Sequence, residues 1–265
     1  MTAPRRGPWL RRLLVAGISL AGLAGLLCMP VTTKQGVNFT VSVHPLPLYL
    51  KTLSFLDRHY QYRHLARAIT RGLHSDRTKV FALYDWTRAH IHPQPPELPV
   101  VDDHIWHIII RGYGEDDQIA DVFTTLATYA GLPAFWTQVE VPRGGDGVII
   151  SFVRVEGHWA VFDVAHNLVF TKPDGTLADV QELLVTPELV RRTVGSLAPY
   201  SIPYAQFLAG LEPFEVPNVL RARKQMPWPR LWYALRYATA RSDTSSGDLL
   251  DRRVSTMPIT ARSLR

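Results

Sequence analysis

The sequence predicts a domain of mixed helices and strands, carried behind an N-terminal helix that crosses a membrane. Three segments support this prediction: an uncharged apolar run at residues 13–33, an amphipathic helix that ends before Gly131, and a hairpin formed by Val148–Val155 and His158–Asp163. With 265 residues and 46% hydrophobic content, the chain can form one well-packed domain plus appendages.

The apolar run at residues 13–33 is predicted to be an uncleaved, single-pass signal anchor. As a helix, a run of this length spans ~30 Å, about the thickness of a bilayer core. Four arginines precede it: Arg5, Arg6, Arg11 and Arg12. The positive-inside rule then places residues 1–12, the basic N-terminus, in the cytoplasm and the globular domain on the periplasmic side of the inner membrane. The alternative is a cleaved signal peptide, but apolar residues continue past the weak Gly22-x-Ala24 cleavage site.

The segment after the anchor, residues 34–78, is predicted to be a helical connector that begins with a linker at Pro45–Pro47. A helix is expected from Leu48 to about Leu73, because four apolar residues share one helical face: Tyr49, Leu53, Leu56 and Tyr60. The main domain is predicted at residues 79–219, starting with a helix at 79–91.

The amphipathic helix in the middle of this domain has a continuous apolar face. That face consists of Ile119, Val122, Phe123, Leu126, Ala127 and Ala130. Gly131 and Pro133 end the helix. Carboxylates at its start, from Glu115 to Asp117, lie where backbone N–H groups lack partners, and Asp116 is interpreted as the N-cap.

The C-terminal part, residues 220–265, is predicted to be a basic aromatic tail that differs from the domain in charge. Residues 31–219 carry 15 Lys and Arg against 20 Asp and Glu, whereas residues 220–265 carry 10 against 3. Trp228, Leu231, Trp232 and Leu235 share a helical face in this tail. The tail is expected to bind anionic lipid or an integral membrane protein, and the alternative is a helix packed on its own domain. The basic pI of 9.6 is no argument for nucleic acid, because the charge lies at the two ends.

Several motifs resemble those of bacterial transglutaminase-like proteins. The helix start reads Arg111-Gly112-Tyr113-Gly114-Glu115-Asp116-Asp117-Gln118-Ile119-Ala120, and the helix end reads Gly131-Leu132-Pro133-Ala134. In the family, a Gly-rich turn leads into Cys-Asp-Gln-x-Ala, and the helix ends at Gly-Ile-Pro-Ala. The hairpin, with Glu156-Gly157-His158-Trp159 and then Asp163, also fits the family pattern.

The resemblance implies an α+β fold with a papain/transglutaminase-like core, in which a helix packs on an antiparallel sheet. It also implies acyl transfer or amide hydrolysis by a Cys-His-Asp triad. This chain has Asp116 in the cysteine position, Val148 in the histidine position and Asp163 in the aspartate position. Its one cysteine, Cys28, lies in the apolar N-terminal run. The triad positions are therefore predicted to be vestigial and the protein to be a pseudoenzyme.

Two histidines near the hairpin could replace the missing base. His158 is at the hairpin tip, ~16 Å along the strand from Asp163. His166, three residues after Asp163, is the better placed of the two. Asp102, Asp103, His104 and His107 are the residues that could form a metal cluster. We expect neither a metal nor a cofactor, because the three isoleucines that follow are more typical of a core segment.

Three functional hypotheses follow from the sequence. The first is a membrane-anchored, catalytically inactive protein that serves as a scaffold or binding subunit of an envelope-facing complex. The second is a hydrolase with a rebuilt site around Asp116, Asp163 and His166. The third is a peptide-binding or surface-polymer-binding module that does not turn its ligand over.

Overall fold

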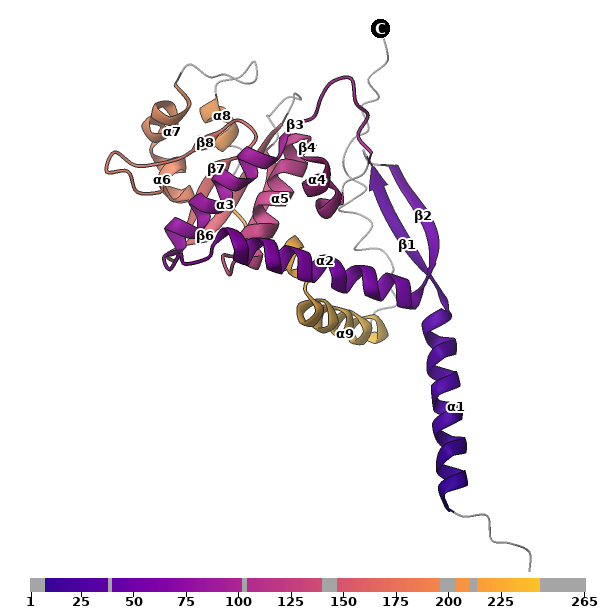
Figure 1. The fold of residues 1–265 in the computed structure, drawn as a ribbon. Coiled ribbons are helices and arrows are strands. Elements are labelled where there is room, and N and C mark those ends of the chain that lie inside the picture. Colours follow the sequence, from indigo (N-terminus) through magenta and orange to yellow (C-terminus); the bar gives the residue numbers. More distant parts are fainter. Residues whose placement is uncertain are drawn as a thin grey trace, which may run out of the picture.

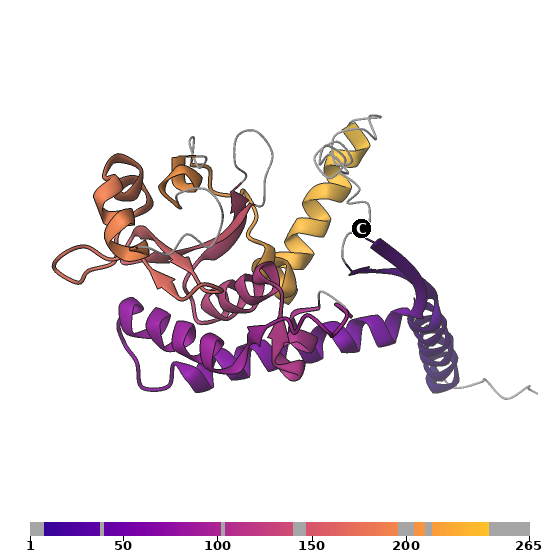
Figure 2. The same ribbon diagram turned by 90° about the horizontal axis from the view of Figure 1, so that it is seen from above.

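The computed structural model describes residues 8–37, 40–101, 104–139, 147–195, 204–209 and 214–243. Figures 1 and 2 show a mixed α/β domain with one long helix extending away from it. The elements are, in chain order, α1 (Pro8–Cys28), β1 (Pro30–Val37), β2 (Thr40–Pro47), α2 (Leu48–Ile69), α3 (Asp76–His90), β3 (His92–Pro93), α4 (Ile105–Arg111), β4 (Tyr113–Gly114), α5 (Asp116–Tyr129), β5 (Ala134–Val139), β6 (Val148–Val155), β7 (His158–Asp163), β8 (Leu168–Val169), α6 (Val180–Val185), α7 (Pro187–Val194), α8 (Tyr204–Ala209), η1 (Arg221–Gln225) and α9 (Pro227–Asp243).

The extended helix α1 is the one described helix that is long and apolar enough to cross a membrane, over Arg11–Cys28. It ends earlier than the sequence predicted, because residues 30–33 belong to strand β1 and not to the spanning helix. Pro30 accounts for this end, since proline lacks the N–H that a helix needs and disfavours helical geometry in the residue before it.

A two-stranded antiparallel hairpin, β1–β2, follows α1 and corrects the prediction that residues 34–78 form a helical connector. Pro30 pairs with Pro47 at one end of the hairpin and Val37 with Thr40 at the other. Figure 1 shows that this hairpin projects from the junction of α1 and α2. That junction is held by backbone contact, because Leu48 N–H donates to the Met29 carbonyl (2.9 Å).

The long helix α2 joins the domain only in its second half. Tyr62 and Ala66 are buried in the main apolar cluster, so α2 is part of the core from about this point and the core begins before residue 79. The predicted apolar face of its first half is exposed, since Leu53 is 59% and Tyr60 is 60% exposed.

Helix α3 packs on the core with four residues that share one helical face. Val80, Leu83, Tyr84 and Thr87 are all buried. The helix begins at Asp76, three residues before the predicted start. Ser75 caps it by accepting a hydrogen bond from the Thr78 N–H (3.1 Å).

Helix α5 is the central helix of the domain. All residues from Gln118 to Thr128 are buried, and α2, α3 and strands β5 and β6 pack around the helix. The predicted apolar face is confirmed, since Ile119, Phe123 and Leu126 lie in the main cluster. Because the helix is enclosed along its length, only its first turn can present side chains to a ligand.

The sheet beside α5 has the strand order β5-β6-β7-β8, with each neighbouring pair antiparallel. The hairpin β6–β7 has the predicted boundaries. Its turn residues, Glu156 (φ 51°) and Gly157 (φ 91°), are both in the left-handed region, as a tight two-residue hairpin turn requires.

The sheet face opposite α5 holds a second apolar cluster. Phe152, Phe170 and Leu183 are buried there with residues of α7 and α8. Figures 1 and 2 show α6, α7 and α8 gathered at the end of the domain far from α1. Helix α7 has Pro187 in its first turn, where the missing N–H of proline costs no helical hydrogen bond.

The segment η1 belongs to the domain and not to a separate tail. Leu220 and Ala222 are buried, and the Tyr129 hydroxyl of α5 donates to the Gln225 carbonyl (3.0 Å). The predicted tail at residues 220–265 therefore begins too early. The sequence marks the segment only by its positive charge, and its buried contacts depend on residues about 100 positions away.

Candidate functional site

The first turn of α5 is fixed by a capping box between Glu115 and Gln118. Glu115 is the N-cap, and its N–H donates to the Gln118 side-chain oxygen (3.2 Å). That oxygen also accepts from an Arg111 guanidinium nitrogen (2.5 Å). Asp116 is thus the first helical residue, and its interpretation as the N-cap is wrong by one position.

This correction gives a direct prediction for two neighbouring substitutions. Glu115→Ala is expected to lower the free energy of unfolding by about 1 kcal/mol, because the capping box is lost. Asp116→Ala should cost less, since its 4.0 Å contact with His166 is partly open to solvent. Chemical denaturation of both variants in detergent gives the comparison, and a larger loss for Asp116→Ala would contradict the capping assignment.

Asp163, at the end of β7, is a fully buried carboxylate with three donors around it. It accepts the backbone N–H of His166 (3.0 Å) and the Nδ1–H of the same residue (3.0 and 2.9 Å to its two oxygens). The Tyr204 hydroxyl of α8 donates to it as well (2.8 Å). Asp163 therefore fixes both the position and the tautomer of the imidazole.

The imidazole of His166 lies between Asp163 and Asp116. Its Nδ1 faces Asp163, and its Nε2 lies 4.0 Å from Asp116 Oδ2 at the start of α5. The side chains of His166 and Asp116 are 28% and 39% exposed, so the pair is accessible from solvent. The three residues of the rebuilt-site hypothesis thus meet in space as an Asp116–His166–Asp163 row.

The electrostatics of this row favour a charged imidazole. The hydrogen bond to Asp163 raises the pKa of His166 above its ordinary value, burial opposes this, and the charges of Asp163 and Asp116 raise the pKa further. The proton on Nε2 then faces Asp116. The arrangement can hold an imidazolium between two carboxylates.

The turn that carries His166 is held from α3. Asn167 has a positive φ of 60°, a conformation that asparagine tolerates better than most residues. The Tyr84 hydroxyl donates to the Asn167 side-chain oxygen (2.9 Å). Burial raises the pKa of Tyr84 to about 12, which keeps it a donor at neutral pH.

The predicted histidine position holds no base. Val148 is fully buried with Ile150 and Phe152 in the second apolar cluster. The single cysteine, Cys28, lies at the end of α1. A thiol–imidazole pair therefore cannot form at the start of α5, because the His166 imidazole lies there but the thiol does not.

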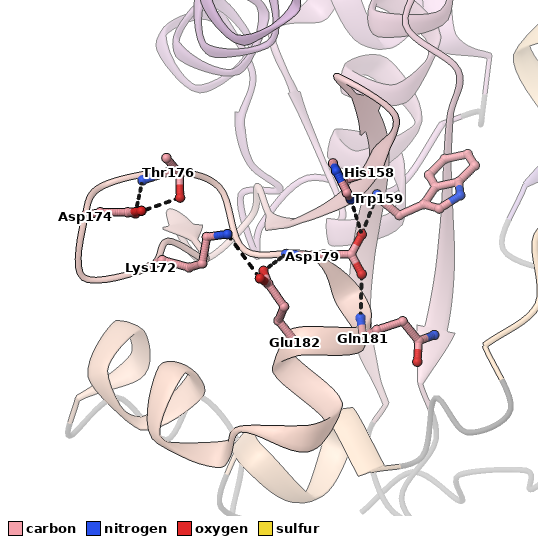
Figure 3. Close-up of polar contacts among 8 residues, drawn as sticks. All are labelled: His158, Trp159, Lys172, Asp174, Thr176, Asp179, Gln181 and Glu182. Atoms are coloured by element: carbon pink, nitrogen blue, oxygen red, sulfur yellow. Dashed lines mark hydrogen bonds and ion pairs between the residues drawn. The ribbon is translucent and has the colours of Figure 1, made fainter.

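His158 is at the other end of β7, where a cavity of about 300 Å³ opens beside the hairpin turn. Figure 3 shows that the polar groups around this cavity contact one another. Asp179 accepts the Trp159 and Gln181 N–H groups (2.9 and 2.8 Å), and Lys172 pairs with Glu182 (3.0 Å). The bonds of Asp179 connect the hairpin to the start of α6, and the Lys172–Glu182 pair connects α6 to the loop before it. The polar groups around the cavity therefore hold these elements together.

The possible metal cluster gains no support from the described residues. His104 and His107 lie with ring centroids 4.7 Å apart at the start of α4, while Asp102 and Asp103 lie outside the described residues. In the described ranges, no group of three or more His, Cys, Asp and Glu could hold a metal ion.

In this mixed α/β domain, the first turn of α5 faces the His166–Asp163 pair at the end of an antiparallel sheet. Residues 63–164 match the transglutaminase-like superfamily, so the chain contains a transglutaminase-like domain. No curated protein gives a significant match to the sequence.

Three solved structures resemble parts of the chain. A candidate cysteine protease from Cytophaga hutchinsonii is 17% identical over 46% of this chain and 43% of its own, with a TM-score of 0.35. A candidate protease from Parabacteroides distasonis is 14% identical over 57% and 40%, with a TM-score of 0.33. A TGase is 14% identical over 64% and 51%, with a TM-score of 0.32. The chain thus spans about half or less of the length of each.

Tyr204 is the site residue that the sequence did not indicate. It lies 41 residues after Asp163 in the six-residue helix α8, and no motif marks it. The contact between the Tyr204 hydroxyl and the Asp163 carboxylate could not be predicted from the sequence, because it depends on how α8 folds against β7.

Proposed function

We propose that this protein is a membrane-anchored transglutaminase-like protein that performs no thiol-based acyl transfer. It serves as a scaffold or binding subunit of a complex on the extracytoplasmic side of the inner membrane. The observation that supports this best is that α5 begins with a carboxylate, Asp116, at the position that the family resemblance assigns to the nucleophilic thiol.

A carboxylate in this position changes the chemistry of the site. A thiolate that attacks an amide forms a thioester, which an amine or water then resolves. A carboxylate that attacks the same amide would form a mixed anhydride while expelling an amine, a far less favourable exchange. The acyl-enzyme route of the family is therefore closed to Asp116.

The Asp116–His166–Asp163 row can join elements of the domain and can also contact a partner. Asp163 and Tyr204 join β7 to α8, and His166 links both to the first turn of α5. The side chains of Asp116 and His166 are partly exposed, so a polar group of a bound chain could contact them.

The orientation follows from α1 and its flanking charge. Basic residues lie at the N-terminal end of the apolar helix, and the rest of the chain, beginning with β1–β2, follows its other end. The protein should remain in membranes after carbonate washing, and a protease added to intact spheroplasts should digest the domain.

The proposal is tested with the full chain purified in detergent. Transamidation and amide hydrolysis by the wild type should not exceed those of the Asp116→Asn variant, and a partner should co-purify in a fixed ratio from native membranes. Asp174→Asn is the matched control, because this carboxylate lies on an exposed loop away from the row. Hydrolysis that Asp116→Asn abolishes, or purification of the chain alone from mild detergent, would contradict the proposal.

A second candidate function is hydrolysis without a covalent intermediate, which the 4.0 Å approach of His166 Nε2 to Asp116 favours. Asp116 would take a proton from water while the water oxygen attacks a carbonyl carbon. His166 would give its Nε2 proton to the leaving nitrogen or oxygen as the bond breaks. This route predicts turnover that both Asp116→Asn and His166→Gln abolish and that thiol reagents leave unchanged.

A further inference from the structure

Helix α9 presents an apolar face outside the folded domain. Trp228, Leu231, Trp232 and Leu235 follow the i, i+3, i+4, i+7 spacing of one helical face. Trp228 is 79% and Trp232 is 70% exposed. Tryptophans as exposed as Trp228 and Trp232 are unusual on a water-soluble domain, and an apolar patch of this kind marks an interaction site.

The placement of α9 beside the anchor indicates what that occupant is. In Figure 1, α9 lies below α2, on the side toward which α1 extends. In Figure 2, the view from above, α1 is foreshortened while α2 and α9 extend across the picture. If α1 crosses a bilayer along its normal, α9 lies close to the membrane plane, near the level where α1 leaves it.

The charges around α9 fit the same surface. Arg223, Lys224, Arg230 and Arg236 lie on η1 and α9, and residues 227–242 contain no acidic residue. The preceding part of the chain, residues 31–219, has a net charge of −5. An anionic surface would attract this basic segment and repel the rest of the domain.

The helix is also tied to the domain on its other side. Lys224 lies 5.0 Å from the centre of the Tyr233 ring, and Arg221 pairs with Asp121 of α5 (2.9 Å). Arg221 also lies 5.8 Å from the centre of the Trp136 ring. These contacts connect α9 through η1 to α5, the helix that begins with Asp116.

We propose that α9 is an interfacial helix that lies on the same bilayer that α1 crosses, with its Trp228–Leu235 face among the lipid headgroups and upper acyl chains. Tryptophan is favoured at this depth because its ring is amphipathic, and the basic residues of η1 and α9 contact anionic headgroups. With α1 and α9 both held, the domain has two attachments and its candidate site keeps a fixed orientation to the membrane. This inference rests on the membrane anchor of the proposed function.

The test uses the full chain in nanodiscs of phosphatidylcholine and phosphatidylglycerol. In a Cys28→Ser background, a nitroxide label is placed at one of four positions: Trp232→Cys or Leu231→Cys on the apolar face, Arg230→Cys on another face of α9, or Leu20→Cys in α1. Collision rates with oxygen, which partitions into lipid, and with a water-soluble nickel chelate are then measured by electron paramagnetic resonance.

Positions 231 and 232 should collide more with oxygen than with nickel, and position 230 should show the reverse. A label at position 20 reports on the anchor alone. It should collide more with oxygen than with nickel whether or not α9 lies on the bilayer. If position 20 reads as lipid while 231 and 232 read as water, the interfacial helix is refuted and the anchor stands. If position 20 also reads as water, the anchor itself fails. Shielding of 231 and 232 from both reagents would indicate a protein contact and would likewise overturn the lipid proposal.

Discussion

Replacing Asp163 with alanine is expected to lower the free energy of unfolding by about 3 kcal/mol, since removing the acceptor of a buried group costs about 1–3 kcal/mol. The substitution leaves the Tyr204 hydroxyl and the His166 N–H groups without their acceptor, and Asp163 itself is fully buried. Urea denaturation of the detergent-solubilised protein, followed by near-UV circular dichroism, measures the loss.

The control for this experiment is Asp174→Ala. Asp174 also accepts two hydrogen bonds, both from Thr176, but it lies on an exposed loop. Its loss should cost much less than that of Asp163. Equal effects of the two substitutions would show that the Asp163 network contributes little to the fold.

Ending the chain after Pro217 is expected to destabilise the domain, whereas ending it after Met226 should not. The shorter chain loses the buried Leu220 and the Arg221 partner of Asp121, which is 5% exposed. Apolar burial contributes about 2 kcal/mol, and the loss of the cation beside a buried carboxylate costs at most about 3 kcal/mol. The guanidinium is half-exposed and Asp121 still accepts the Trp136 Nε1–H (2.6 Å), so we expect a total loss of roughly 3–5 kcal/mol.

Thermal unfolding of the two truncated chains separates the roles of η1 and α9. The chain that ends after Met226 keeps η1 and should unfold close to the wild type, although its domain would lose the second membrane attachment. If the chain that ends after Pro217 unfolds at the wild-type temperature, η1 contributes nothing to the core and the domain ends earlier than the structure indicates.

The sequence was sufficient to predict the elements whose packing is local. The apolar face of α5 and the turn at Glu156-Gly157 depend on periodicity and turn geometry, and both are as predicted. Residues 34–47 were misassigned, because two prolines were interpreted as a linker where they lie in a strand. Periodicity in the first half of α2 was real, but it does not distinguish a face that meets protein from one that is exposed.

The candidate site could be predicted only in part for a similar reason. His166 is three residues from Asp163, so their contact could be anticipated from spacing. The approach of His166 to Asp116 depends on how β7 ends beside α5, and Tyr204 arrives from another helix. The role of η1 depends on Arg221 meeting Asp121 across 100 residues, which composition alone presents as surface charge.

The pH dependence of the row follows from the raised pKa of His166. A folded-state pKa above the unfolded value means that the row stabilises the fold fully below the unfolded pKa, about 6.5. This contribution is then lost as the pH rises through the folded pKa. Asp163→Asn should remove most of this dependence, because the hydrogen bond to Asp163 is the largest cause of the shift.

Nitrogen-15 NMR of the histidine side chains tests the central claim, that Asp116, His166 and Asp163 form one charged row in place of a thiol triad. The His166 signal is assigned by its absence in His166→Gln, and its titration is followed in the wild type, Asp116→Asn and Asp163→Asn. We predict a His166 pKa above 6.5 that falls in both variants, and further in Asp163→Asn than in Asp116→Asn. A pKa at or below 6.5 that neither substitution changes would contradict the account.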